Sequence, residues 1–180
     1  SITQPGKARV YGKEKAFFRD IAFVPLDMPT NVPLARDIID LLPLVDAKRD
    51  TINGESSVEP EGGVRLPRSN KAVRLEFPYA PPPEYDFEIE FTVEEGNSGY
   101  VMQVLTVPGH WLDWRLLPPP AFGPALDGVE PGNGQRTAGI GKLFRLKPGD
   151  RHRSLVEVRK NSLRAVVDGE EIASYTGDLK

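Results

Sequence analysis

Two hairpin turns in succession near the end of the sequence constrain the fold more than any other stretch. The run Ser154 to Arg159 alternates polar and apolar residues, and Lys160-Asn161 reverses the chain into Ser162 to Val167. Asp168-Gly169 then turns it again into Glu170 to Tyr175. An Asp-Gly pair between β-branched runs favours a type I′ turn, because both positions need a positive φ that Asp and Gly tolerate. The stretch is therefore predicted to be a three-stranded antiparallel meander.

The composition agrees with a fold of many short strands. Pro and Gly number 18 and 17 among 180 residues, against an ordinary combined share of roughly 12%. Cys is absent, which excludes disulfides, thiol catalysis and thiolate metal sites but leaves the redox compartment undetermined. The net charge of −3 provides no basic field, so nucleic acid is not an expected partner. No apolar run approaches the roughly 18 residues of a membrane span.

Alternation predicts further strands. Ala16 to Val24 is rich in aromatic and β-branched residues, and Glu84 to Val93 is the most regular alternation in the chain. Others are expected over Ala8–Tyr11, Ala72–Phe77, Gly99–Val107, His110–Leu117 and Ile140–Leu146. Residues 34–44 have apolar spacings of a short helix or turn, and residues 118–134 are predicted to be a long loop. The expected fold is all-β, a two-sheet antiparallel β-sandwich forming a single domain over residues 1–180.

The meander also carries a resemblance. The pattern VEVRKxxLRAVVDGEEIASY, at Val156 to Tyr175, resembles the laminin-G-like, concanavalin A-like β-sandwich domains. It is most similar to those of planctomycete bacteria related to the 3-keto-disaccharide hydrolase family, and the resemblance covers Leu41 to Tyr175. In those families such strands form the sugar-facing half of a jelly roll. The resemblance thus implies a jelly roll that binds carbohydrate.

One strand departs from the order of that family. FFRDIAFVPL, beginning at Phe17, resembles the last strand of these domains but here comes first. Residues 1–26 therefore either belong to a preceding domain or supply the closing strand of a permuted sandwich. The second explanation is favoured because jelly-roll termini lie side by side. The chain begins at Ser1 without Met, so a fragment or processed product is expected, with its targeting segment elsewhere.

A row of acids is the most enzyme-like pattern. Asp86, Glu88 and Glu90 share one face of a strand, opposite an apolar face. Alternate residues lie ~6.6 Å apart, within reach of the ~5–5.5 Å carboxyl separation of a retaining glycosidase. The row is similar to the ExDxE strand of laminarinase-type glycoside hydrolases, but its order is DxExE. The favoured interpretation is a solvated face, paired with cations such as Arg74 or Arg159.

A second candidate site lies on the strand from His110 to Leu117. Alternation groups Leu112, Trp114 and Leu116 in the core, with the Trp114 indole N–H donating to a carbonyl. Trp111, Asp113 and Arg115 then share the opposite face, where an aromatic plane beside charged groups suits a pyranose ring. The alternative is that Asp113 and Arg115 pair with strand neighbours while Trp111 packs under Pro118 to Pro120.

Metal and cofactor chemistry have little support. Asp46 and Asp50 are the only candidate calcium ligands, and two carboxylates four residues apart more often cap turns. His110 and His152 are the only imidazoles, and no HExxH or GxSxG occurs. The sequence predicts a non-catalytic module, without cofactor, that binds carbohydrate or a protein partner within a larger extracytoplasmic bacterial protein. A glycoside or keto-sugar hydrolase, and a structural assembly domain, remain as alternatives.

Overall fold

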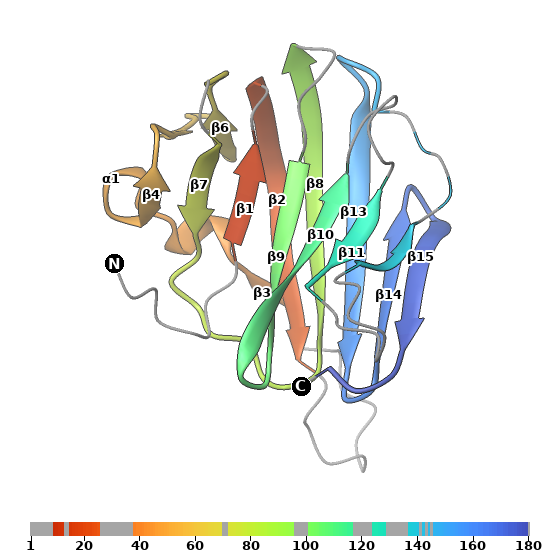
Figure 1. The fold of residues 1–180 in the computed structure, drawn as a ribbon. Helices are drawn as coiled ribbons and strands as arrows, with labels where there is room; N and C mark the ends of the chain where they lie inside the picture. Colours follow the sequence, from red (N-terminus) through yellow and green to blue (C-terminus); the bar gives the residue numbers. More distant parts are fainter. Residues whose placement is uncertain are drawn as a thin grey trace.

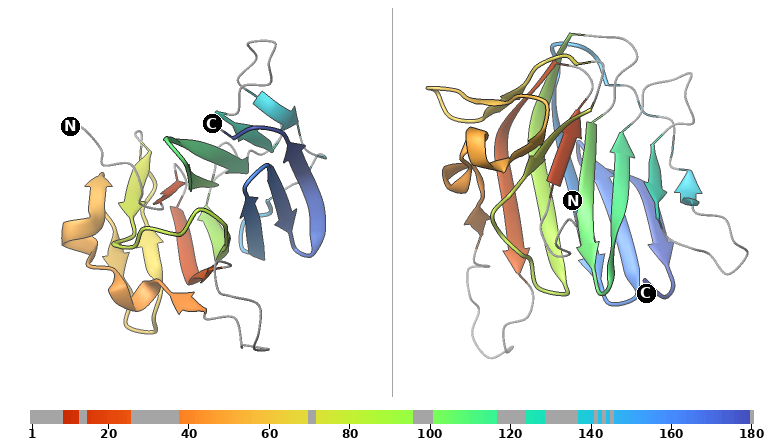
Figure 2. Two further views of the ribbon diagram at one scale, coloured as in Figure 1. Left: turned by 90° about the horizontal axis from the view of Figure 1, so that it is seen from below. Right: turned by 60° about the vertical axis from the view of Figure 1, so that its left-hand side comes forward.

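The structure is a computed structural model that describes residues 9–12, 15–25, 38–69, 72–95, 101–116, 124–128, 137–140, 142, 144 and 146–179. These residues form two antiparallel sheets, which overlap in Figure 1 and are seen from below, along the strands, in the left view of Figure 2. The predicted all-β, two-sheet sandwich is confirmed. Among the described residues, no helix has the length and apolar character needed to cross a membrane.

The first sheet, sheet A, has seven strands. In order across the sheet they are β12 (Thr137–Ile140), β11 (Ala125–Asp127), β10 (His110–Leu116), β9 (Val101–Val107), β1 (Arg9–Gly12), β7 (Val73–Glu76) and β4 (Thr51–Asn53). The N-terminal strand β1 therefore lies between β9 and β7, and joins parts of the chain that are far apart in sequence.

The second sheet, sheet B, has eight strands, seven of them along its main path. They are β15 (Glu170–Thr176), β14 (Ser162–Val167), β13 (Arg151–Arg159), β8 (Tyr85–Glu95), β2 (Lys15–Pro25), β6 (Val64–Leu66) and β5 (Ser57–Val58), with β3 (Ile39–Asp40) also paired to β2. Strands β13, β14 and β15 pair in succession and form the predicted meander. At its second turn, Asp168 and Gly169 have φ of 51° and 85°.

Strand β2 lies inside sheet B, with β8 on one side and β6 and β3 on the other. Phe18, Ile21 and Phe23 are all buried, although their spacing of three and then two breaks strict alternation. A register shift between Phe18 and Asp20 restores the phase, so that residues on both sides of it face the core. Phe23 stacks on Phe87 of β8 with ring centroids 4.6 Å apart.

A chain of buried hydrogen bonds joins the two sheets through the core. The Trp114 Nε1–H donates to Ser154 Oγ at 3.1 Å, and that hydroxyl donates to Gln103 Oε1 at 2.7 Å. Gln103 Nε2 then donates to the carbonyl of Phe87 at 3.1 Å. Trp114 is therefore core, as predicted, but its partner is a hydroxyl and not a carbonyl.

Three stretches differ from the expected local structure. Within residues 34–44, of which the structure describes 38–44, Ile39 is extended and pairs with Phe23, and only the 3₁₀ turn Leu42–Leu44 is helical. Strand β11 falls inside the predicted loop 118–134, where it pairs with β10 and β12. The strand expected over 140–146 ends at Ile140, and the backbone amide of Lys142 donates a hydrogen bond to Ile172 of β15. In each case pairing with a distant strand decides the conformation.

Candidate functional site

The outer face of sheet A carries the candidate site. On β10, Leu112, Trp114 and Leu116 are fully buried against sheet B. Alternation turns Trp111, Asp113 and Arg115 outward. Trp111 keeps 50% of its surface exposed, which is unusual for so large an apolar side chain. Pro118 to Pro120, under which Trp111 was alternatively expected to pack, lie outside the described residues.

Cross-strand register extends this face over neighbouring strands. Asp113 lies opposite Asp127 of β11 on one side and Val104 of β9 on the other. Val104 in turn lies opposite Arg9 of β1, which is opposite Glu76 of β7. We call this surface the sheet-A face. It comprises Arg9, Arg74, Glu76, Met102, Val104, Thr106, Trp111, Asp113, Arg115 and Asp127.

Ion pairs fix the charged groups on both sides of the sheet-A face. Arg115 Nη2 lies 3.1 Å from Asp113 Oδ2 and 2.5 Å from Asp127 Oδ2, so one nitrogen holds both carboxylates. Across β9, Arg9 Nε donates to Glu76 Oε2 at 2.8 Å. The ion pairs of Arg115 match the alternative in which Asp113 and Arg115 pair with strand neighbours. Trp111, on the same strand, is nevertheless exposed.

Asp113 is the titratable group most altered by this environment. Burial raises the pKa of its carboxyl, hydrogen bonding and charge from Arg115 lower it, the charge of Asp127 raises it again and that of Arg74 lowers it. The net effect is a pKa above the ordinary value. A carboxyl whose pKa is raised in this way, beside a second carboxylate, marks a candidate functional position.

Apolar side chains lie between the two charged groups. Met102 and Val104 project outward from β9, but they are only 8% and 2% exposed and form a small cluster with Ala72. These side chains are covered, so what the sheet-A face offers a ligand is the aromatic plane of Trp111 beside fixed charges, a combination that can orient an amphipathic ligand such as a sugar.

Sequence reasoning found Trp111, Asp113 and Arg115 but missed the residues that complete their surroundings. Asp127 was assigned to a loop because its strand has only three residues. Arg9 and Glu76 were not connected, because the two residues are 67 positions apart in the sequence. Only the sheet order, which local periodicity does not encode, brings them to one face.

The row Asp86, Glu88 and Glu90 lies on the outer face of sheet B and not near this site. Asp86 Oδ1 accepts from Arg159 at 2.7 Å and Glu88 Oε2 from Arg153 at 2.6 Å. Glu90 pairs with Arg151. Cross-strand cations are present as expected, with two corrections. Arg74 is not among them, since β7 belongs to sheet A. Asp86 is only 5% exposed, so the face is not solvated at that position.

The carboxylates proposed as calcium ligands have structural partners. Asp46 caps the short helix α1 (Ala47–Asp50), accepting from the backbone amides of Lys48 and Arg49 at 3.0 and 2.9 Å. Asp50 accepts from the amide of Asp46 at 2.8 Å and from the Arg49 guanidinium. Within the described part of the chain, no three His, Cys, Asp or Glu side chains form a metal-binding group.

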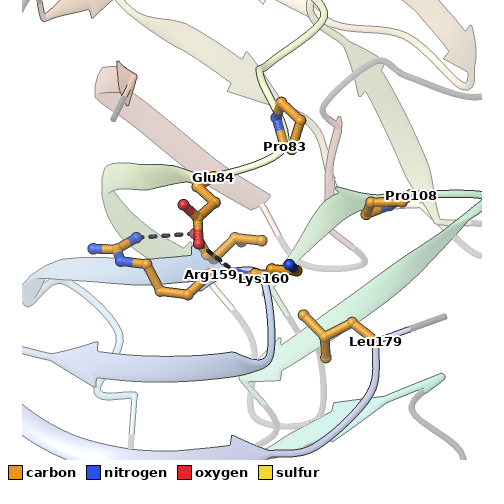
Figure 3. Close-up of a pocket in the computed structure, with 7 residues that line it drawn as sticks. Pro83, Glu84, Pro108, Arg159, Lys160 and Leu179 are labelled. Carbon is orange, nitrogen blue, oxygen red and sulfur yellow. Dashed lines mark hydrogen bonds between the residues drawn. The ribbon is translucent and has the colours of Figure 1, made fainter. Parts of the chain in front are cut away.

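A cavity of about 310 Å³ opens at one end of the sandwich, and none of the predicted site residues lines it. It is lined by Pro83, Glu84, Pro108, Val158, Arg159, Lys160 and Leu179 (Figure 3). Two polar side chains of the lining have partners: Glu84 accepts from the Lys160 amide at 2.7 Å, and Arg159 donates to the Tyr85 carbonyl at 3.1 Å. What remains is a small apolar recess.

Comparisons of the chain with protein-family models, with curated proteins and with solved structures found no match.

Proposed function

We propose that this protein is a non-catalytic β-sandwich module that binds carbohydrate on the sheet-A face, as part of a larger extracytoplasmic bacterial protein. The observation that carries the proposal is the half-exposed indole of Trp111 beside fixed charges. The C–H face of a pyranose stacks on an indole, and its hydroxyls pair with carboxylates and guanidinium groups at the ring edge. The resemblance at Val156 to Tyr175 supports the same class of ligand and the same setting.

The exposure of Trp111 favours a binding role over a purely structural one. A tryptophan that served only the core would be buried as Trp114 is, at 0% exposed. A half-exposed tryptophan loses the benefit of burial unless a partner covers it. Asp113 and Arg115, which alternation places on the same side of β10, are held by the ion pairs described above. A ring stacked on Trp111 would therefore meet polar groups already in position.

The hydrolase alternative based on Asp86, Glu88 and Glu90 has weaker support. A nucleophile or general acid needs carboxylate oxygens that reach the substrate. Here a guanidinium engages each of the three side chains. The arrangement fits cross-strand stabilisation of sheet B better than catalysis.

The test is glycan binding by the unaltered chain and by Trp111→Ala. After a glycan array has identified a bound oligosaccharide, calorimetry should show Trp111→Ala weakening binding by ~1–3 kcal/mol, as expected for a lost stacked aromatic. The melting temperature should change little, because half of the side chain is already exposed. Arg153→Ala, on the outer face of sheet B, is the matched control and should bind normally.

Two results would contradict the proposal. One is glycan affinity that is the same with and without the Trp111 side chain. The other is a large loss of stability in Trp111→Ala, which would make the residue part of the core. A glycosidase rate abolished by Glu88→Gln would instead favour the hydrolase.

A further inference from the structure

The charges on the sheet-A face are balanced among the side chains that the structure describes. Arg9, Arg74 and Arg115 contribute three positive charges, and Glu76, Asp113 and Asp127 contribute three negative ones. Arg115 holds two carboxylates and Arg9 holds one. The charge of Arg74 also acts on Asp113. The arginines of this face thus already serve its own acids.

The position of the acids relative to Trp111 matters more than the sum of the charges. Asp113 is two residues from Trp111 along β10, which places the two side chains ~6.6 Å apart on the same face. Asp127 lies directly opposite Asp113 on the adjacent strand. A ring stacked on Trp111 would therefore have its edge toward two carboxylates that share one guanidinium, which leaves this group with one net negative charge. A carboxylate or sulfate on that ring would meet like charge, which is strongly disfavoured where water is partly excluded.

Hydroxyl groups suit the same environment. A carboxylate accepts hydrogen bonds but donates none when ionised, and its two oxygens can accept several, so Asp113 and Asp127 can take further donors beside Arg115. Arg115 contacts both acids through Nη2 alone, and a guanidinium has five N–H donors, so Nε and Nη1 can donate to hydroxyl oxygens. A sugar hydroxyl both donates and accepts, and can bridge these groups without separating the ion pairs.

We infer that the sheet-A face selects uncharged glycans and rejects glycans that carry carboxylate or sulfate groups, with Asp113 and Asp127 responsible for the rejection. The inference rests on the proposed function and adds the chemical class of the ligand. It also implies that binding depends little on salt, since a neutral ligand has no charge for salt to screen.

The experiment compares matched neutral and acidic glycans. Galacto-oligosaccharides and oligogalacturonates of equal length differ in the carboxylate at C6, and cello-, xylo- and manno-oligosaccharides extend the neutral set. Heparin fragments supply sulfates. At least one neutral glycan should bind at least ~10-fold more tightly than any acidic glycan, a difference of about 1.4 kcal/mol. Its affinity should be the same in low and high salt and should fall in Trp111→Ala.

Asp127→Asn tests which residues reject the acid. It removes one negative charge but keeps a side chain of the same size, so the affinity for oligogalacturonate should rise several-fold relative to that for the neutral partner. Glu88→Gln, the same kind of change on sheet B, should leave the ratio unaltered. Melting curves of both variants show whether each is folded, and Asp113→Asn supplies a second test should Asp127→Asn fail to fold.

The outcomes separate this inference from the proposed function. Acidic glycans that bind as tightly as neutral ones, and lose affinity in Trp111→Ala, would overturn the inference while supporting a sugar site. The inference also fails if the ratio of the affinities for acidic and neutral glycans is the same in Asp127→Asn and Asp113→Asn as in the unaltered chain. Absence of binding to every glycan in the panel would overturn both.

Discussion

Among single residues, Asp113 offers a signature of its environment that titration can detect. Its pKa is raised mainly by burial, so the folded state binds a proton more tightly than the unfolded state does. The stability that this protonation contributes is complete below the unfolded pKa of about 3.9 and is lost as pH rises through the higher folded value. The free energy of unfolding of the unaltered chain minus that of Asp113→Asn should therefore fall as pH rises above about 4.

Urea denaturation of both proteins across this range measures the difference. Glu171 on β15 provides a control of opposite sign, because hydrogen bonding to Arg164 lowers the pKa of its exposed carboxyl. The ionised Glu171 carboxylate therefore contributes stability that is present above the unfolded pKa and disappears as pH falls through the folded pKa. The corresponding difference for Glu171→Gln should rise with pH. Slopes of the same sign for both residues would show that the environment of Asp113 is not as described.

Residue patterns in the sequence predicted the part of the candidate site that lies on β10 but not the residues that neighbouring strands contribute. Strict alternation on β10 was enough to place Trp114 in the core and Trp111 outside, since the period of two is a property of the strand itself. The hydroxyl partner of Trp114 was not predictable, because Ser154 belongs to the other sheet and approaches only when the sheets pack. Asp127 was missed because β11 has only three residues and is defined by its pairing with β10 and β12.

At the scale of elements, the hairpin between β5 and β6 depends on two adjacent glycines with different surroundings. Gly62 and Gly63 have φ of +86° and +95°. A Cβ on Gly62 would meet no atom within 4 Å, but one on Gly63 would lie 2.4 Å from the carbonyl oxygen of Phe18 in β2. Gly62→Ala should cost about 1–2 kcal/mol from left-handed backbone alone. Gly63→Ala should cost a further ~1–3 kcal/mol from the clash.

Chemical denaturation of both alanine variants gives the two costs directly. Both glycines lie in the same turn and have positive φ, so the difference between the two costs in unfolding free energy isolates the contact with β2. Equal destabilisation would mean that the hairpin does not lie against Phe18 as the structure shows.

Elements with strong local signals were predicted well, and those defined by a distant partner were not. The Asp168-Gly169 turn encodes its own geometry, so the meander follows from a few residues. Ile39, in contrast, lies in a helix-like pattern but is extended because it pairs with Phe23 of β2. The register shift in β2 was equally hidden, because it becomes necessary only when β8 fixes which side chains face the core.

For the whole molecule, the N-terminal strands determine whether either sheet is continuous. Strand β1 joins β9 to β7 in sheet A, and β2 joins β8 to β6 in sheet B. Deleting residues 1–26 would divide both sheets and remove buried Phe18, Ile21 and Phe23, each contributing about 1.5–3 kcal/mol. The shortened chain should show no cooperative unfolding transition and should aggregate through its open edges.

Thermal melts followed by circular dichroism, together with size-exclusion chromatography, test this deletion. Removing only residues 1–7, which keeps both strands, is the control and should preserve a cooperative transition. A chain lacking residues 1–26 that remains monomeric with the same melting temperature would contradict the pairing described here. The two-sheet class followed from alternation and turn residues, but the central place of β1 did not, since nothing local in Arg9–Gly12 identifies β7 and β9 as its neighbours.

The hydrogen-bond chain from Trp114 through Ser154 to Gln103 has a consequence for recognition on the opposite side of β10. Trp114 stands between Asp113 and Arg115 in the sequence, so the bond that ties its indole to sheet B also restrains the backbone from which those two side chains project. Sliding one sheet past the other would leave three buried polar groups unsatisfied, which favours a single alignment. A ligand that meets Asp113 and Arg115 should therefore sacrifice little conformational entropy of the protein, and more of its contact energy should remain as affinity.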